Sequence, residues 1–271
     1  MKKVITYVAL TFLLSSAGYY LIINSKALGL SPALLMLYLM WCPGISGMAT
    51  SLIYEKSLSG IGWKPGKLRW LGLGYFLPIC YAAVAYGIIW LSGFGGINHD
   101  YRINALLLIV LGPAISVVYA AGEEIGWRGF MLPQLYKSKG FTASCLITGI
   151  VWAVWHFPLI ITGLYLAKMP MGPQLLLVLA TITAMTFAIG WLRLKSGSVW
   201  PAVLMHASHN FYIQWLFDPL TTETGTMSKY MMGESGIVLT VIFIGLALVF
   251  WSQRGRLPKM TRPINKQQSH E

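Results

Sequence analysis

The sequence predicts an all-α, polytopic membrane protein with about eight transmembrane helices, and three observations support this class. First, 56% of the 271 residues are hydrophobic and only 10% are charged, whereas roughly a quarter of a soluble domain is charged. Second, apolar runs of about 20 residues, each long enough to cross a bilayer, follow one another along the chain. Third, Lys and Arg lie mainly in the gaps between these runs. The 11 Trp, 14 Tyr and 11 Phe residues exclude a disordered chain, and three cysteines provide no disulfide framework.

We expect the membrane spans at about residues 4–24, 32–53, 70–93, 103–126, 141–166, 174–192, 199–217 and 236–252. Pro43, Pro113 and Pro158 fall inside these runs and predict kinks, which neighbouring helices can accommodate. The spans occupy most of residues 1–252, which we expect to form a single transmembrane helical domain. Residues 253–271 are polar and basic, and they predict a disordered cytoplasmic tail that contacts anionic lipid.

The distribution of basic residues predicts the orientation of the chain. If the N-terminus is cytoplasmic, 15 Lys and Arg residues fall on the cytoplasmic side and 4 on the other side. This bias predicts an integral membrane protein with both termini in the cytoplasm. We expect the membrane to be a bacterial plasma membrane. The formal net charge is +12, but the basic residues form no patch interleaved with aromatic residues. We therefore expect the lipid bilayer as a partner and no nucleic acid.

Two acids and an arginine in the fourth span are candidate functional residues, because ionisable groups inside a membrane are costly. Glu124 and Arg128 are four residues apart, so they lie about 40° apart on an α-helix and predict an ion pair. Glu123 lies about 140° from Arg128, and we expect it to lack a local partner and to suit a general base. The alternative is a buried ion-pair cluster that only fixes helix packing. The remaining acids, Glu234 among them, are expected in loops or the tail without a catalytic role.

Two later spans carry histidines. His156 lies in an apolar stretch, four residues after Trp152. His206 and Asn210 are four residues apart and share one helix face, whereas His209 lies about 100° from Asn210. We expect His209 to be an interhelical hydrogen-bond donor that packs helices together. A role as an interhelical hydrogen-bond donor remains the alternative for His156.

Helical rise from the nearest cytoplasmic lysines puts Glu123, His156 and His206 at similar depths, roughly 17–25 Å into the membrane. We therefore expect one polar active site in the cytoplasmic half of the bundle. A carboxylate base, imidazoles and an amide donor are groups that hydrolysis needs. Because Asn210 is a poor zinc ligand and a good oxyanion donor, we expect a glutamate-activated water with no required cofactor. A divalent metal such as zinc stays possible, held by Glu123, His156 and His206.

Three motifs in this order resemble the CAAX prenyl endopeptidase and bacteriocin-processing (CPBP) family of intramembrane proteases. They are Glu123-Glu124-x-x-x-Arg128, Trp152-x-x-x-His156 and His206-x-x-x-Asn210. They define a motif-bearing core of about residues 103–217, and that family usually has Phe where Trp152 stands. The resemblance implies an intramembrane endopeptidase acting on a peptide or protein, which can be lipidated or membrane-bound.

The resemblance also implies a role for each motif residue. Glu123 would activate a water molecule with help from His156. His206 and Asn210 would stabilise the oxyanion, while the Glu124–Arg128 pair would hold the site together. Two other classes stay open, namely a non-catalytic immunity or chaperone-like membrane protein of the same family, and a proton-coupled transporter. The transporter is less favoured, since a relay needs carboxylates along a path to both membrane faces.

Overall fold

Long apolar segments of the sequence become antiparallel helices in the computed structural model, which describes residues 1–102, 104, 110–166 and 169–259. The α-helices are α1 (Lys2–Ile23), α2 (Ser25–Leu28), α3 (Pro32–Glu55), α4 (Leu68–Leu91), α5 (Gly112–Glu124), α6 (Leu132–Ile161), α7 (Met171–Ser196), α8 (Trp200–Asn210), α9 (Ser228–Met231) and α10 (Ile237–Ser252). Shorter elements are the 3-10 helices η1 (Ser59–Ile61) and η5 (Gln253–Arg256), the π-helices η3 (Ile125–Met131) and η4 (Phe211–Phe217), and the strands β1 (Gly95–Ile97) and β2 (Thr221–Glu223).

Parts of the sequence predictions fall outside the described residues. These are the start of the fourth span at residue 103, most of the predicted tail, and three of the basic residues used for the orientation, Lys168, Arg262 and Lys266. The described start of the tail is not an extended coil, because Gln253–Arg256 forms η5.

Among the described residues, six helical segments are long and apolar enough to cross a membrane. They are Lys2–Ile23, Pro32–Glu55, Leu68–Leu91, Gly112–Ile161, Met171–Ser196 and Ile237–Arg256. The all-α membrane architecture is thereby confirmed. Gly112–Ile161 has 50 residues, far more than one crossing needs, and its backbone turns at Gly140, where φ is 73°. The predicted span at 199–217 is helical as α8 and η4 but is not among the six, so the count of eight stays a prediction.

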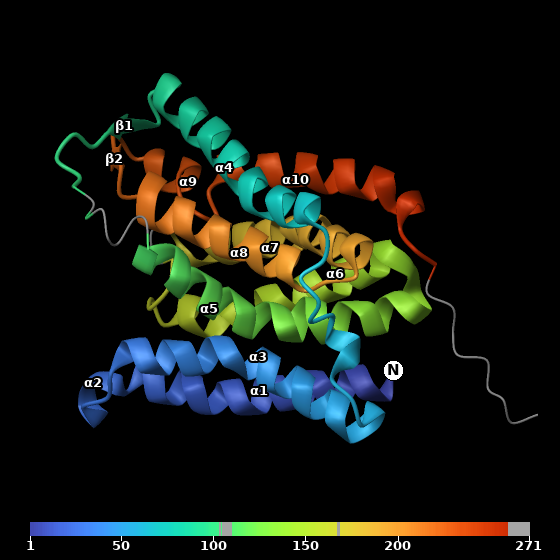
Figure 1. Ribbon diagram of the computed structural model, residues 1–271. Coiled ribbons are helices and arrows are strands. Elements are labelled where there is room, and N and C mark those ends of the chain that lie inside the picture. The colour runs from blue at the N-terminus through green and yellow to red at the C-terminus, as the bar shows by residue number, and fades with distance from the viewer. Residues whose placement is uncertain (103, 105–109, 167–168, 260–271) are drawn as a thin grey trace, which may run out of the picture.

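Basic residues gather at one end of the bundle, which we call the basic end. There Lys3 at the start of α1 donates to Glu55 at the end of α3 over 3.0 Å. Lys195 at the end of α7 donates to the backbone oxygen of Arg256 over 2.5 Å. The opposite end carries α2 and the antiparallel pair β1–β2, as Figure 1 shows. Most basic residues of the described chain thus lie at one end of the bundle. Which end faces the cytoplasm stays a prediction.

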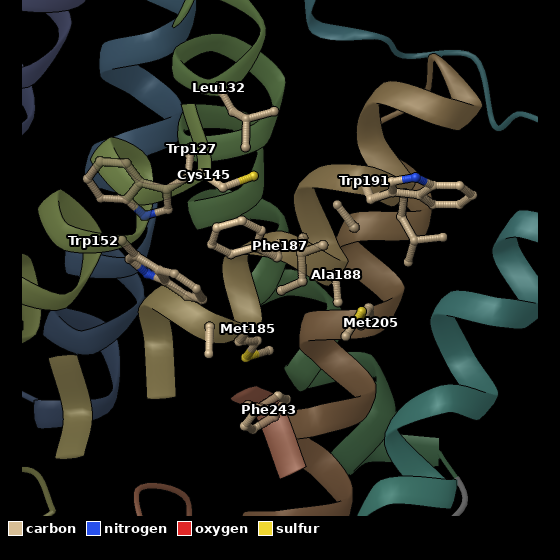
Figure 2. Packing of buried hydrophobic residues seen from close by; sticks show 14 of the residues in the cluster. Trp127, Leu132, Cys145, Trp152, Met185, Phe187, Ala188, Trp191, Met205 and Phe243 are labelled. Carbon is tan, nitrogen blue, oxygen red and sulfur yellow. The ribbon is translucent and has the colours of Figure 1, made fainter. Parts of the chain in front are cut away.

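The helices stack in layers, with α1 and α3 below α5 and α6, and with α4, α8 and α10 above (Figure 1). The interior is filled mainly by aromatic and aliphatic side chains, including Trp127, Trp152 and Phe187 (Figure 2). The outer surface is also apolar: Leu68 is 82% exposed and Leu91 is 92% exposed. Such a surface suits contact with lipid rather than with water.

Glycines allow α3 and α5 to approach each other at backbone distance. A Cβ atom added to Gly44 would lie 2.5 Å from the backbone oxygen of Gly122, and one added to Gly122 would lie 2.6 Å from the backbone oxygen of Met40. Gly126 in η3 meets the backbone of Pro43 in the same way. Small residues at such crossings are typical of membrane helices that pack closely. This contact sets where the end of α5, with its two glutamates, lies in the bundle.

Candidate active site

The two glutamates at the end of α5 have different partners. Arg128 Nη1 donates to Glu124 Oε1 over 2.7 Å, and both side chains are fully buried. Arg128 Nη2 also donates to the hydroxyl of Thr186 on α7, over 3.0 Å. Glu123, only 2% exposed, is not part of this pair. Its Oε2 accepts a 2.6 Å hydrogen bond from the indole N–H of Trp152 on α6. The sequence predicts no local partner for Glu123, and Trp152 lies 29 residues away in the chain.

Two of the three motifs lie where an α-helix changes to a π-helix. The π-helix η3 begins directly after Glu124, and η4 begins directly after Asn210. Arg128 lies in η3, where each turn is wider than in an α-helix, so the angles calculated for a regular α-helix do not apply to it. The Glu124–Arg128 pair nevertheless forms across the boundary. Single π-turns within helices are frequently found at functional sites.

His206 on α8 lies between the two glutamates. Its Nδ1 is 3.0 Å from Glu124 Oε1, and its Nε2 is 4.0 Å from Glu123 Oε1. Because a carboxylate only accepts, Nδ1 carries the proton in this contact. Nε2 therefore points toward the side on which Glu123 lies. His206 is 5% exposed, so these contacts are shielded from solvent.

His156 on α6 is held by its own helix and by aromatic rings. Its Nδ1 is 2.9 Å from the backbone oxygen of Trp152, which is an acceptor only. The rings of Trp155 and Tyr165 lie 4.9 Å and 5.8 Å from the imidazole, measured between ring centroids. The imidazole is thus fixed in orientation, with Nε2 left to contact other groups.

A cavity of about 240 Å³ connects these side chains. Glu123, His156, His206 and Asn210 all line it, and so does Trp152. The buried Oδ1 of Asn210 makes no hydrogen bond within the described residues. The polar groups of these five residues come from α5, α6 and α8, and most of the other lining residues are apolar. Glu124 and Arg128 lie behind this wall, where Glu124 contacts His206 and Arg128 contacts the ring of Trp152.

The cavity extends away from the basic end. It is lined by Met36 near the start of α3, Tyr165 after α6, Gln214 in η4 and Glu234 before α10, all toward the β1–β2 end. Within the described chain, no Lys or Arg lines it. The expected site in the half of the bundle that carries the basic residues is therefore not confirmed. The depth estimate assumed straight α-helices, whereas the path from Glu123 to the nearest lysine passes through η3.

Glu234 lies in the loop before α10, as expected, but it also lines the cavity, which was not expected. Its Oε2 accepts from the Tyr165 hydroxyl over 2.6 Å and from the Gln214 amide over 3.0 Å. Its Oε1 lies 3.6 Å from Nε2 of His209. Burial alone would raise the pKa of Glu234, but His209 and the Tyr165 hydroxyl bring it down to about 2. A charged carboxylate therefore faces the far side of the cavity at neutral pH.

His209 has a packing role and a place in the cavity wall. Its Nδ1 lies 2.9 Å from the hydroxyl of Tyr81 on α4, which is the interhelical contact that the sequence analysis expected. It also lines the cavity beside Glu234, which was not expected. Nothing in the local sequence marks either residue, since their contacts join segments far apart in the chain.

The predicted metal ligands do not form a ligand group. Within the described part of the chain, no three His, Cys, Asp or Glu side chains gather to hold a metal ion. Glu123 Oε2 accepts from Trp152 instead, and His206 Nδ1 faces Glu124. The arrangement does not fit a His₂Glu zinc site, and independence from a metal stays a prediction.

Comparison with known proteins bears on this site. A family model described as Type II CAAX prenyl endopeptidase Rce1-like matches residues 104–212. CAAX prenyl protease 2 of Methanococcus maripaludis is 37% identical over 46 residues. That alignment covers 17% of this chain and 17% of the relative, so the chain matches about a sixth of the relative's length.

All three motifs lie inside the family match. The chain is therefore an integral membrane protein with a CAAX-protease-like segment. Residues 104–212 are Rce1-like, and the resemblance that the motifs indicated is confirmed over that segment.

Proposed function

We propose that this protein is an intramembrane endopeptidase that hydrolyses a peptide bond with a water molecule activated by Glu123. The observation that carries the proposal is the cavity in which Glu123, His156, His206 and Asn210 meet. A carboxylate, two imidazoles and an amide around one space provide a base, proton carriers and oxyanion donors. The Rce1-like match over the same residues supports this class of reaction.

Each group has a role that follows from its contacts. Glu123 takes a proton from water, and the hydroxide formed attacks the carbonyl carbon of the scissile peptide bond. The carbonyl oxygen becomes an oxyanion, which Asn210 and the imidazolium form of His206 stabilise by donating hydrogen bonds. Protonated Glu123, with His156 on the same cavity wall, returns the proton to the leaving nitrogen, and the C–N bond breaks. The products are a carboxylate and an amine.

Glu124 and Arg128 support the reaction from behind the cavity wall. Glu124 accepts from His206 Nδ1 and from Arg128, so it holds the imidazole while Arg128 balances its charge. His206 donates from Nδ1 in this contact, and its imidazolium form can also donate from Nε2 into the cavity. No step assigned here requires a metal ion.

The substrate class we propose is a membrane-associated or lipidated peptide or protein. The mostly apolar cavity inside a helical bundle is suited to an apolar substrate segment. The relative's name, CAAX prenyl protease 2, points to a prenylated chain end as the first probe.

The two other classes make different use of the same residues. A non-catalytic member of the family would keep the cavity and the ion pair without turnover, so an activity assay separates it from the protease. A transporter would need a polar path across the bundle. Toward the basic end, the described residues next to the site include Trp127, Phe130 and Met131, which are buried and apolar.

The test uses the purified protein in detergent with a farnesylated fluorogenic peptide that ends in a CAAX sequence. We expect the wild type to release the C-terminal tripeptide and Glu123→Gln to release none while remaining folded. In parallel, the C-termini of membrane proteins are compared between cells that express the wild type and cells that express Glu123→Gln. If neither experiment separates the two proteins, the endopeptidase proposal is wrong and the non-catalytic class is favoured.

A further inference from the structure

Trp152 contacts four of the six predicted site residues. Its indole N–H donates to Glu123 Oε2 over 2.6 Å, and its backbone oxygen lies 2.9 Å from His156 Nδ1. Arg128 Cζ lies 3.9 Å from the centroid of the indole ring. The ring of His206 meets the indole edge to face at 5.3 Å. Trp152 is 2% exposed, so solvent does not compete for these contacts.

The indole N–H determines which oxygen of Glu123 is left to act. An indole nitrogen can only donate, and a carboxylate can only accept, so Trp152 is the donor and Glu123 the acceptor. It occupies Oε2. Oε1 is the oxygen nearer to His206, with Nε2 at 4.0 Å, and it is the one left to take a proton from water.

The backbone oxygen of Trp152 determines the tautomer of neutral His156. Because this oxygen only accepts, the proton of neutral His156 sits on Nδ1. Nε2 then carries the lone pair and can accept a hydrogen bond from water. This backbone contact would remain with any residue at position 152, so the N–H contact to Glu123 is the one that depends on tryptophan.

We propose that Trp152 is a positioning residue of the hydrolytic site, whose indole N–H holds the Glu123 carboxylate with Oε1 available to the water. A phenylalanine, which is usual at this place in the motif, would keep a ring over Arg128 but would have no group to donate. The inference rests on the proposed function, because it assigns Glu123 as the base. It adds that this chain orients its base through a side chain on a neighbouring helix.

The kinetic test compares Trp152→Phe with Trp127→Phe. Both changes replace an indole with a phenyl ring at a site at most 2% exposed in the same buried cluster (Figure 2). Trp127 is the matched control, because its indole nitrogen makes no hydrogen bond within the described residues. With the farnesylated CAAX peptide, we expect Trp152→Phe to lower kcat about 10- to 100-fold, as for loss of a hydrogen bond to a charged group. KM should change less than about threefold, because the lost contact is to the base and not to the substrate.

A spectroscopic test is independent of turnover. In protein labelled with ¹⁵N at the indole nitrogens, the resonance missing from Trp152→Phe identifies Trp152. We expect this resonance to shift in Glu123→Gln, where the charged acceptor is lost, and to stay unchanged in Glu223→Gln, which alters an exposed acid in β2.

The outcomes separate the inference from the proposed function. If the wild type does not cleave the peptide, the proposed function fails, while the spectrum still tests the Trp152–Glu123 contact. An unmoved resonance in Glu123→Gln overturns the inference whatever the activity. Equal kcat values for Trp152→Phe and Trp127→Phe overturn the positioning role even if the resonance shifts.

Discussion

Replacing Glu124 with Gln should destabilise the protein far more than the same change at Glu123. Glu124 and Arg128 are fully buried and 2.7 Å apart, so the change leaves a buried guanidinium without its counter-charge. Removing one partner of a buried ion pair typically costs about 3–5 kcal/mol. For a chain of this size, each kcal/mol lowers the melting temperature by roughly 2–4 °C, so we expect a decrease of roughly 6–20 °C.

Glu123→Gln is the matched control, because it makes the same chemical change at the neighbouring position. The Gln side chain can still accept from the Trp152 N–H through its amide oxygen, and Arg128 keeps its partner Glu124. We expect its melting temperature to stay within a few degrees of the wild type, a shift of about 1 kcal/mol or less. Glu123→Gln should have no turnover although it folds. In Glu124→Gln, by contrast, any loss of turnover should be accompanied by a lower yield of folded protein.

The assay is thermal unfolding of the detergent-purified proteins, followed by tryptophan fluorescence and by size-exclusion chromatography of heated samples. The reasoning is refuted if Glu123→Gln melts well below Glu124→Gln. That result would mean that the structural and the catalytic glutamate have been exchanged.

Three further predictions concern the cavity, the metal and the topology. Glu234→Ala should lower turnover about three- to tenfold with folding retained, because Tyr165 loses the acceptor that holds its ring against His156. Glu223→Ala changes an exposed acid outside the cavity and should have no effect on turnover. Equal activities of the two variants would contradict a role for Glu234. Protein treated with a strong chelator and found free of metal by elemental analysis should keep its activity; loss of activity that stoichiometric zinc restores would make Glu123, His156 and His206 ligands instead. A reporter that is active only outside the cytoplasm should be silent when fused after Glu271, as the basic residues predict, and a strong signal there would refute the predicted orientation.

Much of the site could be predicted because its motifs are local. Glu124 and Arg128 are four residues apart, and a helix of either kind brings them to one side, so their pairing needs no tertiary information. The apolar runs likewise predict membrane helices, since backbone groups in a bilayer must be satisfied within the segment.

The contacts that complete the site could not be predicted, because they join distant parts of the chain. The Trp152 indole meets Glu123 only after α6 packs beside α5. Glu234 follows a glycine in a short loop, where no periodic pattern marks a residue as buried, and it reaches the cavity through Tyr165 and Gln214. The π-helices η3 and η4 also leave no sign in the apolar pattern, which is compatible with either kind of turn.

The crossing of α3 over α5 has a consequence for α3, a helix that carries no motif. Where Gly44 meets Gly122 and Pro43 meets Gly126, main chain touches main chain, and no side-chain rotation can take up an error in spacing. Glu123 and Glu124 lie between Gly122 and Gly126 in the chain, so the contact with α3 fixes the position and tilt of both carboxylates. The Rce1-like segment, residues 104–212, does not include α3. Cut from the chain, that segment would keep every motif residue and lose the surface that sets the glutamates in place.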